Sequence, residues 1–271
     1  DMRWFHAGIT CIFLGACVTT GPVTKTFEKA SVRAPVNLLG DAAVAINASA
    51  IEAEAEAYRS RHRPRYSSDS LTALAANVPP GAKLPLIIYF HGCAGIIRAA
   101  IGHLGLLAEL DDFAEIAPDS FARKRPEYCF SNFTVDLSIS GDVRNMRLSE
   151  LDHVMKQVAK LPWVDQNNIF LIGHSQGGGP VSAYDGGVKV RGRIILNGYC
   201  SDLWGDGMSS DEALLTFDSG QDAWFRNFPS DCRAFVLRHG GTSIFEAEAT
   251  THNLALNHWP KVKAFLMDNR R

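Results

Sequence analysis

The sequence lacks a surplus of charge of either sign, an internal repeat and a membrane-spanning apolar run. It carries 27 Lys and Arg against 29 Asp and Glu, a net charge of −2, so nucleic acid is not expected as a partner. The N-terminal apolar stretch, residues 7–16, is shorter than the roughly 20 residues that a spanning helix needs. The remaining composition, 46% hydrophobic over 271 residues, favours one α/β domain whose core needs no metal or disulfide.

Residues 1–17 have the layout of a secretory signal peptide, with Arg3 ahead of the apolar stretch. Their end, Leu14-Gly15-Ala16-Cys17, resembles the lipobox of bacterial lipoproteins. That resemblance implies cleavage before Cys17, lipid on this residue and a domain held at a membrane surface by the anchor alone. The expected location is the bacterial cell envelope, on the periplasmic side of a membrane. An ordinary cleaved signal and a fortuitous apolar start are the alternatives.

Residues 18–78 separate the signal from the regular part of the chain. Residues 18–40 are polar and irregular and suit a tether. Residues 41–63 are rich in Ala and Glu without Gly or Pro, which predicts a helix at the domain edge or within the tether. The catalytic domain is expected to occupy residues 79–271.

From residue 79 onward, short apolar runs alternate with segments of helical spacing. Strands are expected at 84–90, 113–118, 169–173, 193–196, 214–217 and 234–237, and helices at 99–110, 140–160, 178–184 and 259–267. The core face of the 140–160 helix is expected to present Val143, Met146, Leu151, Val154, Met155 and Val158. Alternating strands and helices predict the α/β class, with a mostly parallel sheet and helices on both faces.

A strand-to-helix turn carries the pattern G-x-S-x-G, as Gly173-His174-Ser175-Gln176-Gly177. A serine hydroxyl is a weak nucleophile. A strained turn from a strand to a helix exposes the hydroxyl at the end of the sheet, where it can react. Gly173 and Gly177 are expected because a side chain there would collide with neighbouring backbone. The bare pattern is weak, but an apolar strand before it and a helix after it predict Ser175 as the nucleophile. His174 is expected to point away from the nucleophile and to be structural.

The segment His91-Gly92-Cys93-Ala94-Gly95 follows the first apolar strand. When a serine elbow lies at the end of such a sheet, the loop after an earlier strand supplies one donor of the oxyanion hole. The N–H group of Cys93 or of Ala94 is the expected donor, and that of Gln176, after the nucleophile, is the second. Small residues let the backbone approach the substrate carbonyl. His91 itself is expected to pack and hydrogen-bond rather than to react.

The acid of a catalytic triad should follow Ser175 in the chain and lie just past a strand. Asp222, in the loop after 214–217, is the preferred residue. Asp218 lies too close to the strand, and Asp202 is the reserve. The alternative role for Asp222 is that of a helix cap.

The base should follow the acid, which leaves His239, His252 and His258. His252 lies in a polar loop from which it can reach Ser175 while Asp222 orients its other nitrogen. His239 and His258 remain alternatives.

Four cysteines remain when Cys11 and Cys17 are set aside with the signal. An even number in an exported protein favours disulfides. The preferred pairs are Cys93 with Cys129 and Cys200 with Cys232, since each pair joins the end of a proposed strand to a neighbouring loop. Four buried thiols are the alternative.

With these motifs, residues 84–265 resemble the dienelactone hydrolase family. The resemblance rests on His91-Gly92-Cys93-Ala94-Gly95, Gly173-His174-Ser175-Gln176-Gly177-Gly178, Gly220-Gln221-Asp222, and Pro118-Asp119-Ser120-Phe121 with Arg123 and Cys129. It implies an α/β-hydrolase fold and hydrolysis of small esters or lactones without a cofactor, and no metal ligand is assigned. The family's name-giving enzymes use a cysteine nucleophile, whereas Ser175 stands in that place here.

The expected function is therefore hydrolysis of carboxylic esters through Ser175, His252, Asp222 and an acyl-enzyme. A small-molecule ester is the expected partner. A serine peptidase on the same fold is one alternative, although the short interval between Leu196 and Leu214 leaves little room for a lid. A surface-anchored binding protein without turnover is the other.

Overall fold

A computed structural model describes residues 31–33, 78, 80–96, 98–110, 112–120, 140–200, 204–225 and 232–271. Several sequence-based expectations fall outside these residues. They are the signal segment with Cys17, the 41–63 helix, Cys129 and Asp202.

The described strands form one seven-stranded sheet in the order β1-β3-β2-β4-β5-β6-β7. The strands are β1 (Ser31–Arg33), β2 (Leu84–Phe90), β3 (Ala114–Ala117), β4 (Val164–His174), β5 (Gly192–Leu196), β6 (Ala213–Ser219) and β7 (Thr242–Glu246). Strands β2 to β7 pair in parallel, and β1 pairs antiparallel with β3 at one edge. The expectation of a mostly parallel sheet is confirmed.

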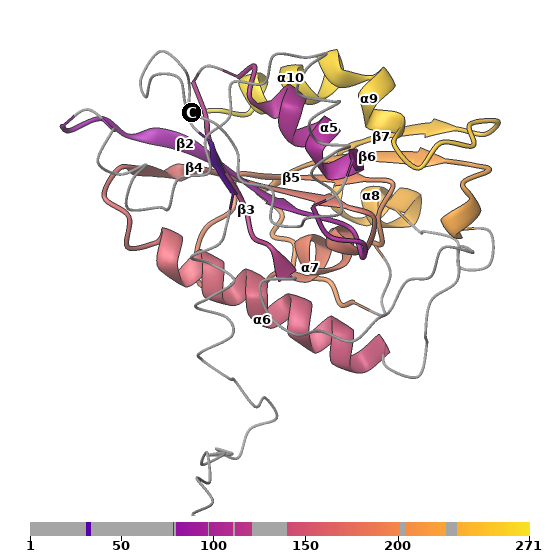
Figure 1. Cartoon of the computed structure of the whole chain (residues 1–271), viewed down its shortest axis with the longest axis horizontal. Helices are drawn as coiled ribbons and strands as arrows, with labels where there is room; N and C mark the ends of the chain where they lie inside the picture. The colour runs from indigo at the N-terminus through magenta and orange to yellow at the C-terminus, as the bar shows by residue number, and fades with distance from the viewer. Residues whose placement is uncertain are drawn as a thin grey trace, which may run out of the picture.

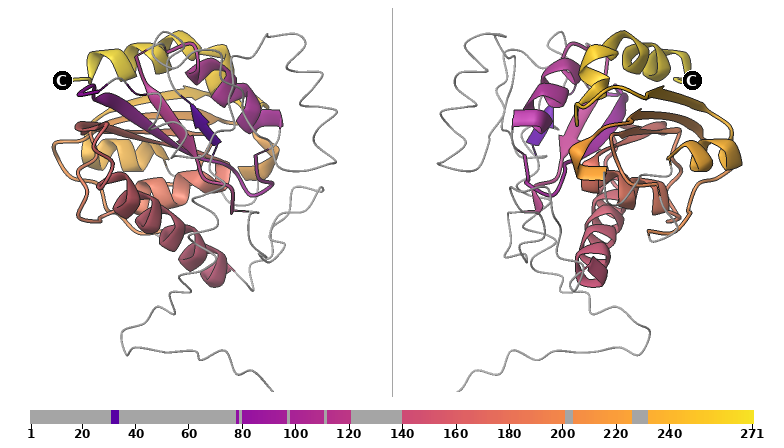
Figure 2. Two further views of the ribbon diagram at one scale, coloured as in Figure 1. Left: turned by 60° about the vertical axis from the view of Figure 1, so that its left-hand side comes forward. Right: turned by 90° about the vertical axis from the view of Figure 1, so that its right-hand side faces the viewer.

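Helices cover both faces of the sheet (Figures 1 and 2). One face carries α5 (Arg98–Leu107), α9 (Leu254–Asn257) and α10 (Trp259–Asp268), and the other carries α6 (Ser140–Val158), α7 (Gly178–Ala183) and α8 (Cys232–His239). Along β2, Ile88 and Phe90 pack towards α6 while Ile87 and Tyr89 pack towards α5. Because both faces are covered, every residue of β2 is buried, which explains its unbroken apolar sequence.

The strand expected at 234–237 is wrong, because these residues belong to α8. Its buried residues, Cys232, Phe235 and Val236, have helical spacing, whereas Leu237 is 86% exposed. The last strand is instead β7, an edge strand without a fully buried residue. A four-residue apolar run fits either element, and an exposed edge strand lacks the apolar signature of a central one.

Helix α6 buries charge where the sequence predicted an apolar residue. Met146 is only partly buried, whereas Arg147 and Glu150 lie on the buried face with the expected aliphatic residues. The expectation for Met146 is therefore wrong. Arg147 enters the interior because the carboxylate of Glu150 and the carbonyl oxygen of His91 accept hydrogen bonds from its guanidinium group.

A disulfide joins Cys200, after β5, to Cys232 at the start of α8, with 4.8 Å between the Cα atoms. This is the pairing preferred from the sequence. Cys93 is also disulfide-bonded. Within the described part of the chain, none of the helices has both the length and the hydropathy to cross a membrane.

Candidate active site

Ser175 occupies a strained turn between β4 and α7. Its φ is 53°, and Asn197 is the only other described residue besides glycine with a positive φ. A 3₁₀ turn, η3 (Ser175–Gly177), leads directly into α7. The strand, the strained residue and the helix after it form the strand-to-helix turn that the motif predicted.

Glycines let the elbow touch its neighbours through bare backbone. A Cβ atom at Gly177 would overlap the carbonyl oxygen of Phe90, and one at Gly173 would overlap that of Gly177. The expectation that side chains are excluded at Gly173 and Gly177 is confirmed. The elbow therefore rests directly on the end of β2.

Asp222 and His252 form a short hydrogen bond. His252 Nδ1 lies 2.6 Å from Asp222 Oδ2, and the Asp222 side chain is 1% exposed. The N–H group of Trp224 donates to the other carboxylate oxygen at 3.0 Å. Because a carboxylate only accepts, the Nδ1 atom of His252 carries the proton and a neutral ring keeps Nε2 as an acceptor.

The other histidines considered as bases contact different carboxylates. His239 lies 2.8 Å from Asp206, and His258 lies 2.6 Å from Glu246. Asp218 remains within strand β6. Of the three histidines considered, the structure brings only His252 to Asp222.

Strand β4 and the loop that carries His252 are connected through His174. Its Nε2 donates to the carbonyl oxygen of His252 at 3.0 Å, and the two rings lie 5.0 Å apart. Within the described residues, no hydrogen bond joins Ser175 to His252. Such catalytic contacts commonly tighten only when substrate binds. His174 thus ties the loop that carries His252 to the end of β4.

Asn197 ties the loop of Asp222 to the loop that carries His252, and sequence reasoning missed it. Its side-chain nitrogen donates to Asp222 Oδ2 and to the carbonyl oxygen of Thr251, both at 3.3 Å, while its oxygen accepts from the N–H of Leu254 at 2.9 Å. Asn197 is fully buried just after β5. The Asn-Gly pair at a strand end was the available signal, since Asn tolerates positive φ.

The segment His91–Gly95 lies against Ser175. A Cβ atom at Gly92 would be 3.1 Å from the Cβ atom of Ser175. Gln176, which follows Ser175 in the chain, is buried, whereas Cys93 is partly exposed and Ala94 is exposed. The segments expected to supply oxyanion donors therefore meet at Ser175.

A pair of buried imidazoles lies behind the base loop. His103 is fully buried between Tyr89, whose hydroxyl is 3.0 Å from its Nδ1, and the ring of His174, 4.9 Å away. Burial lowers the pKa of His103 to about 3, helped by the nearby His252, and burial also lowers the pKa of His174 well below its usual range. Both rings are therefore neutral at pH 7.

Acid is expected to destabilise the fold through His103. The folded pKa lies below the unfolded value of 6.5, so unfolded chains take up the proton first and stability falls as pH drops from about 6.5 towards 3. At pH 4.5 the loss is about 2–3 kcal/mol. Urea unfolding at pH 7.5 and 4.5, for the wild type and His103→Gln, measures it. An equal pH effect in both proteins would contradict the assignment.

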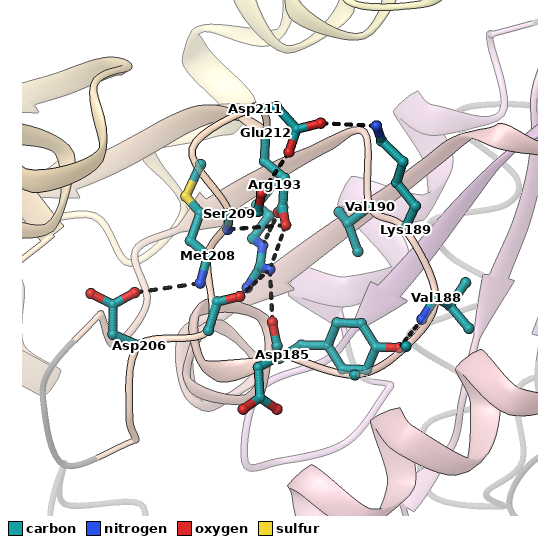
Figure 3. A pocket seen from close by; sticks show the side chains of 14 residues that line it. Asp185, Val188, Lys189, Val190, Arg193, Asp206, Met208, Ser209, Asp211 and Glu212 are labelled. Atoms are coloured by element: carbon teal, nitrogen blue, oxygen red, sulfur yellow. Dashed lines mark hydrogen bonds and ion pairs between the residues drawn. The ribbon is translucent and has the colours of Figure 1, made fainter.

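A pocket of about 530 Å³ lies away from these residues, where β5 and β6 begin (Figure 3). Arg193 within it is bound by Glu212 and by the carbonyl oxygens of α7 and its end, and Lys189 pairs with Asp211 at 2.8 Å. The charges of Arg193, Glu212, Lys189 and Asp211 are thus already matched. In the described ranges, His, Cys, Asp and Glu form no cluster of three or more that could hold a metal.

No protein-family model matches the chain, and no curated protein sequence matches it. Solved structures do. The dienelactone hydrolase-like promiscuous phosphotriesterase P91 from metagenomic libraries aligns at TM-score 0.51 and 14% identity, over 71% of this chain and 89% of that one. Est1E from Butyrivibrio proteoclasticus aligns at 0.50 and 17%, over 70% and 90%. Acetyl xylan esterase 1 from Thermoanaerobacterium aligns at 0.50 and 13%, over 72% and 77%. The chain therefore has the α/β-hydrolase fold.

Proposed function

We propose that the protein is a serine hydrolase that cleaves carboxylic esters, with Ser175, His252 and Asp222 as its triad. The observation that carries the proposal is the Asp222–His252 hydrogen bond of 2.6 Å, in a loop that His174 ties to the nucleophile elbow. A buried carboxylate with this contact fixes the tautomer that a general base needs.

In this mechanism His252 Nε2 takes the proton of Ser175 as its Oγ attacks the ester carbonyl. The developing oxyanion accepts hydrogen bonds from the N–H groups of Gln176 and of the His91–Gly95 segment. When the intermediate collapses, the imidazolium gives its proton to the departing alkoxide. Water, deprotonated by His252, then releases the acid from the acyl-enzyme and restores Ser175.

Aromatic rings lie close to His252, where an ester would approach it. The rings of Trp224 and Phe225 lie 5.9 and 5.6 Å from that of His252, and Tyr199 packs edge-on against Phe225 at 5.1 Å. All three side chains are partly buried. Such a surrounding suits small esters with apolar acyl or alcohol groups, and lactones, as cyclic esters, fit the same chemistry. Two structures similar in fold are named a dienelactone hydrolase-like phosphotriesterase and an acetyl xylan esterase, which supports ester hydrolysis as the general class of reaction.

The decisive experiment combines p-nitrophenyl esters from acetate to octanoate with fluorophosphonate labelling. The wild type is expected to turn over the shorter esters and to be labelled at Ser175, while Ser175→Ala does neither. Ser182→Ala, seven residues along the chain and bonded to the carbonyl of Gly179, is the matched control and is expected to be labelled normally. A wild type with neither turnover nor label would favour a binding protein.

A further inference from the structure

A buried charged cluster lies where α6 crosses the end of β2. Arg147 and Glu150, with side chains 0% exposed, form an ion pair at 3.2 Å. The hydroxyl of Ser120 donates to Glu150 at 2.7 Å and accepts from Arg147. The guanidinium carbon also lies 5.2 Å from the ring centre of Phe90. Within this cluster, each charge is matched by an opposite charge or a hydrogen bond.

Stability alone does not explain such a cluster. Desolvation of a buried ion pair offsets most of its Coulomb energy, and apolar residues of similar volume are often as good. The atoms that hydrogen-bond to the cluster indicate instead that it fixes the loop beside Ser175.

The cluster hydrogen-bonds to His91 at both the backbone and the ring of this histidine. Arg147 Nη2 donates to the carbonyl oxygen of His91 at 2.7 Å, and the N–H of Ser120 donates to His91 Nε2 at 3.1 Å. Since Nε2 accepts, the proton of a neutral ring lies on Nδ1. That nitrogen lies 2.6 Å from the carbonyl oxygen of Gly92 and donates to it.

Holding the Gly92 carbonyl sets the direction of the next N–H group. The Gly92 oxygen also accepts from the N–H of Gly95 at 3.2 Å, so two donors fix it. In a planar trans peptide, the N–H of Cys93 points opposite to the C=O of Gly92. Because Gly92 lies against Ser175, this peptide is the one beside the reacting centre.

We propose that Arg147, Glu150 and Ser120 are positioning residues of the oxyanion hole, which act through His91 to hold the Gly92–Cys93 peptide with the Cys93 N–H as donor. This inference rests on the proposed function. None of the three side chains touches substrate. The guanidinium fork suits the task because it binds a carbonyl, a hydroxyl and a carboxylate at once, which an ammonium group cannot do in a fixed plane. A donor fixed before the reaction needs no reorganisation as charge develops.

The test replaces the ion pair as a unit, by Arg147→Met with Glu150→Gln, so that no lone buried charge remains. We expect kcat for p-nitrophenyl acetate to fall about 10- to 100-fold, short of the full loss of a donor, with KM changed less than about threefold. The affinity of an aryl trifluoromethyl ketone, whose adduct with Ser175 carries an oxyanion, should fall in proportion to kcat/KM. A structural role alone would not produce that proportionality.

The matched control is the second buried pair, Arg193 with Glu212, at the start of β5. Arg193→Met with Glu212→Gln is expected to lose stability but to keep kcat per folded molecule within about threefold. Folded fractions come from near-ultraviolet circular dichroism. Equal kcat losses in both double variants, or wild-type kcat and inhibitor affinity in the Arg147 variant, would overturn the inference.

Variants at His91 supply a rescue test that leaves the ion pair in place. His91→Asn keeps an N–H donor near the position of Nδ1, whereas His91→Leu has none, so kcat should fall clearly more in the leucine variant. Ser120→Ala takes the place of the double variant if that does not fold, with a smaller kcat loss expected at unchanged KM. Equal activity of His91→Leu and wild type would overturn the inference. A wild type without turnover would overturn both this inference and the proposed function.

Discussion

Replacing His252 by alanine is expected to lower kcat for a p-nitrophenyl ester by about 10⁵- to 10⁶-fold, the loss typical of a triad base. Asp222→Ala should cost less, about 10⁴-fold, because a base remains although its tautomer and orientation are no longer fixed. The double variant should be no slower than His252→Ala, since an acid acts only through its base. End-point assays and steady-state kinetics on folded protein measure these losses of kcat.

The chain supplies its own controls for this series. His239→Ala and His258→Ala remove the other histidines that follow Asp222, and each is expected to keep kcat within about threefold because its partner is Asp206 or Glu246. A large kcat loss in either control, or losses that add in the double variant, would contradict the assignment of His252 as the base.

The sequence predicted those parts of the fold and site whose chemistry leaves a local pattern. Central strands are buried on both faces, so β2 and residues 169–172 of β4 appear as unbroken apolar runs. The elbow requires glycine on both sides of Ser175, and the acid must follow a strand. Asp222 satisfied that order, and the structure brings it to His252.

Other parts depend on contacts between distant segments, which no local pattern records. Arg147 looks like a solvated helix residue until Glu150, Ser120 and His91 surround it. Asn197 is a single polar residue whose partners come from two later loops. Strand β7 is exposed at the sheet edge and lacks an apolar run.

The backbone contact between the elbow and β2 provides a second large effect. Gly177→Ala is expected to lower the free energy of unfolding by about 3 kcal/mol or more, at the upper end of overpacking costs. The added carbon would overlap the Phe90 carbonyl and lie 2.8 Å from the oxygen of His91, and backbone cannot turn aside as a flexible side chain can. Because the clash would separate Ser175 from the segment His91–Gly95, the proposed mechanism predicts that kcat also falls about 100-fold.

Urea unfolding and ester turnover on the same samples measure both effects, with Gly187→Ala as control. A Cβ atom added at Gly187, in the loop after α7, would have no atom within 4 Å. The free energy of unfolding of Gly187→Ala should therefore differ from that of the wild type by no more than about 0.5 kcal/mol. Gly177→Ala with wild-type stability and kcat would show that the elbow can move off β2 without loss. In that case the oxyanion donors would not depend on this contact. Loss of kcat at full stability would instead assign the contact to catalysis alone.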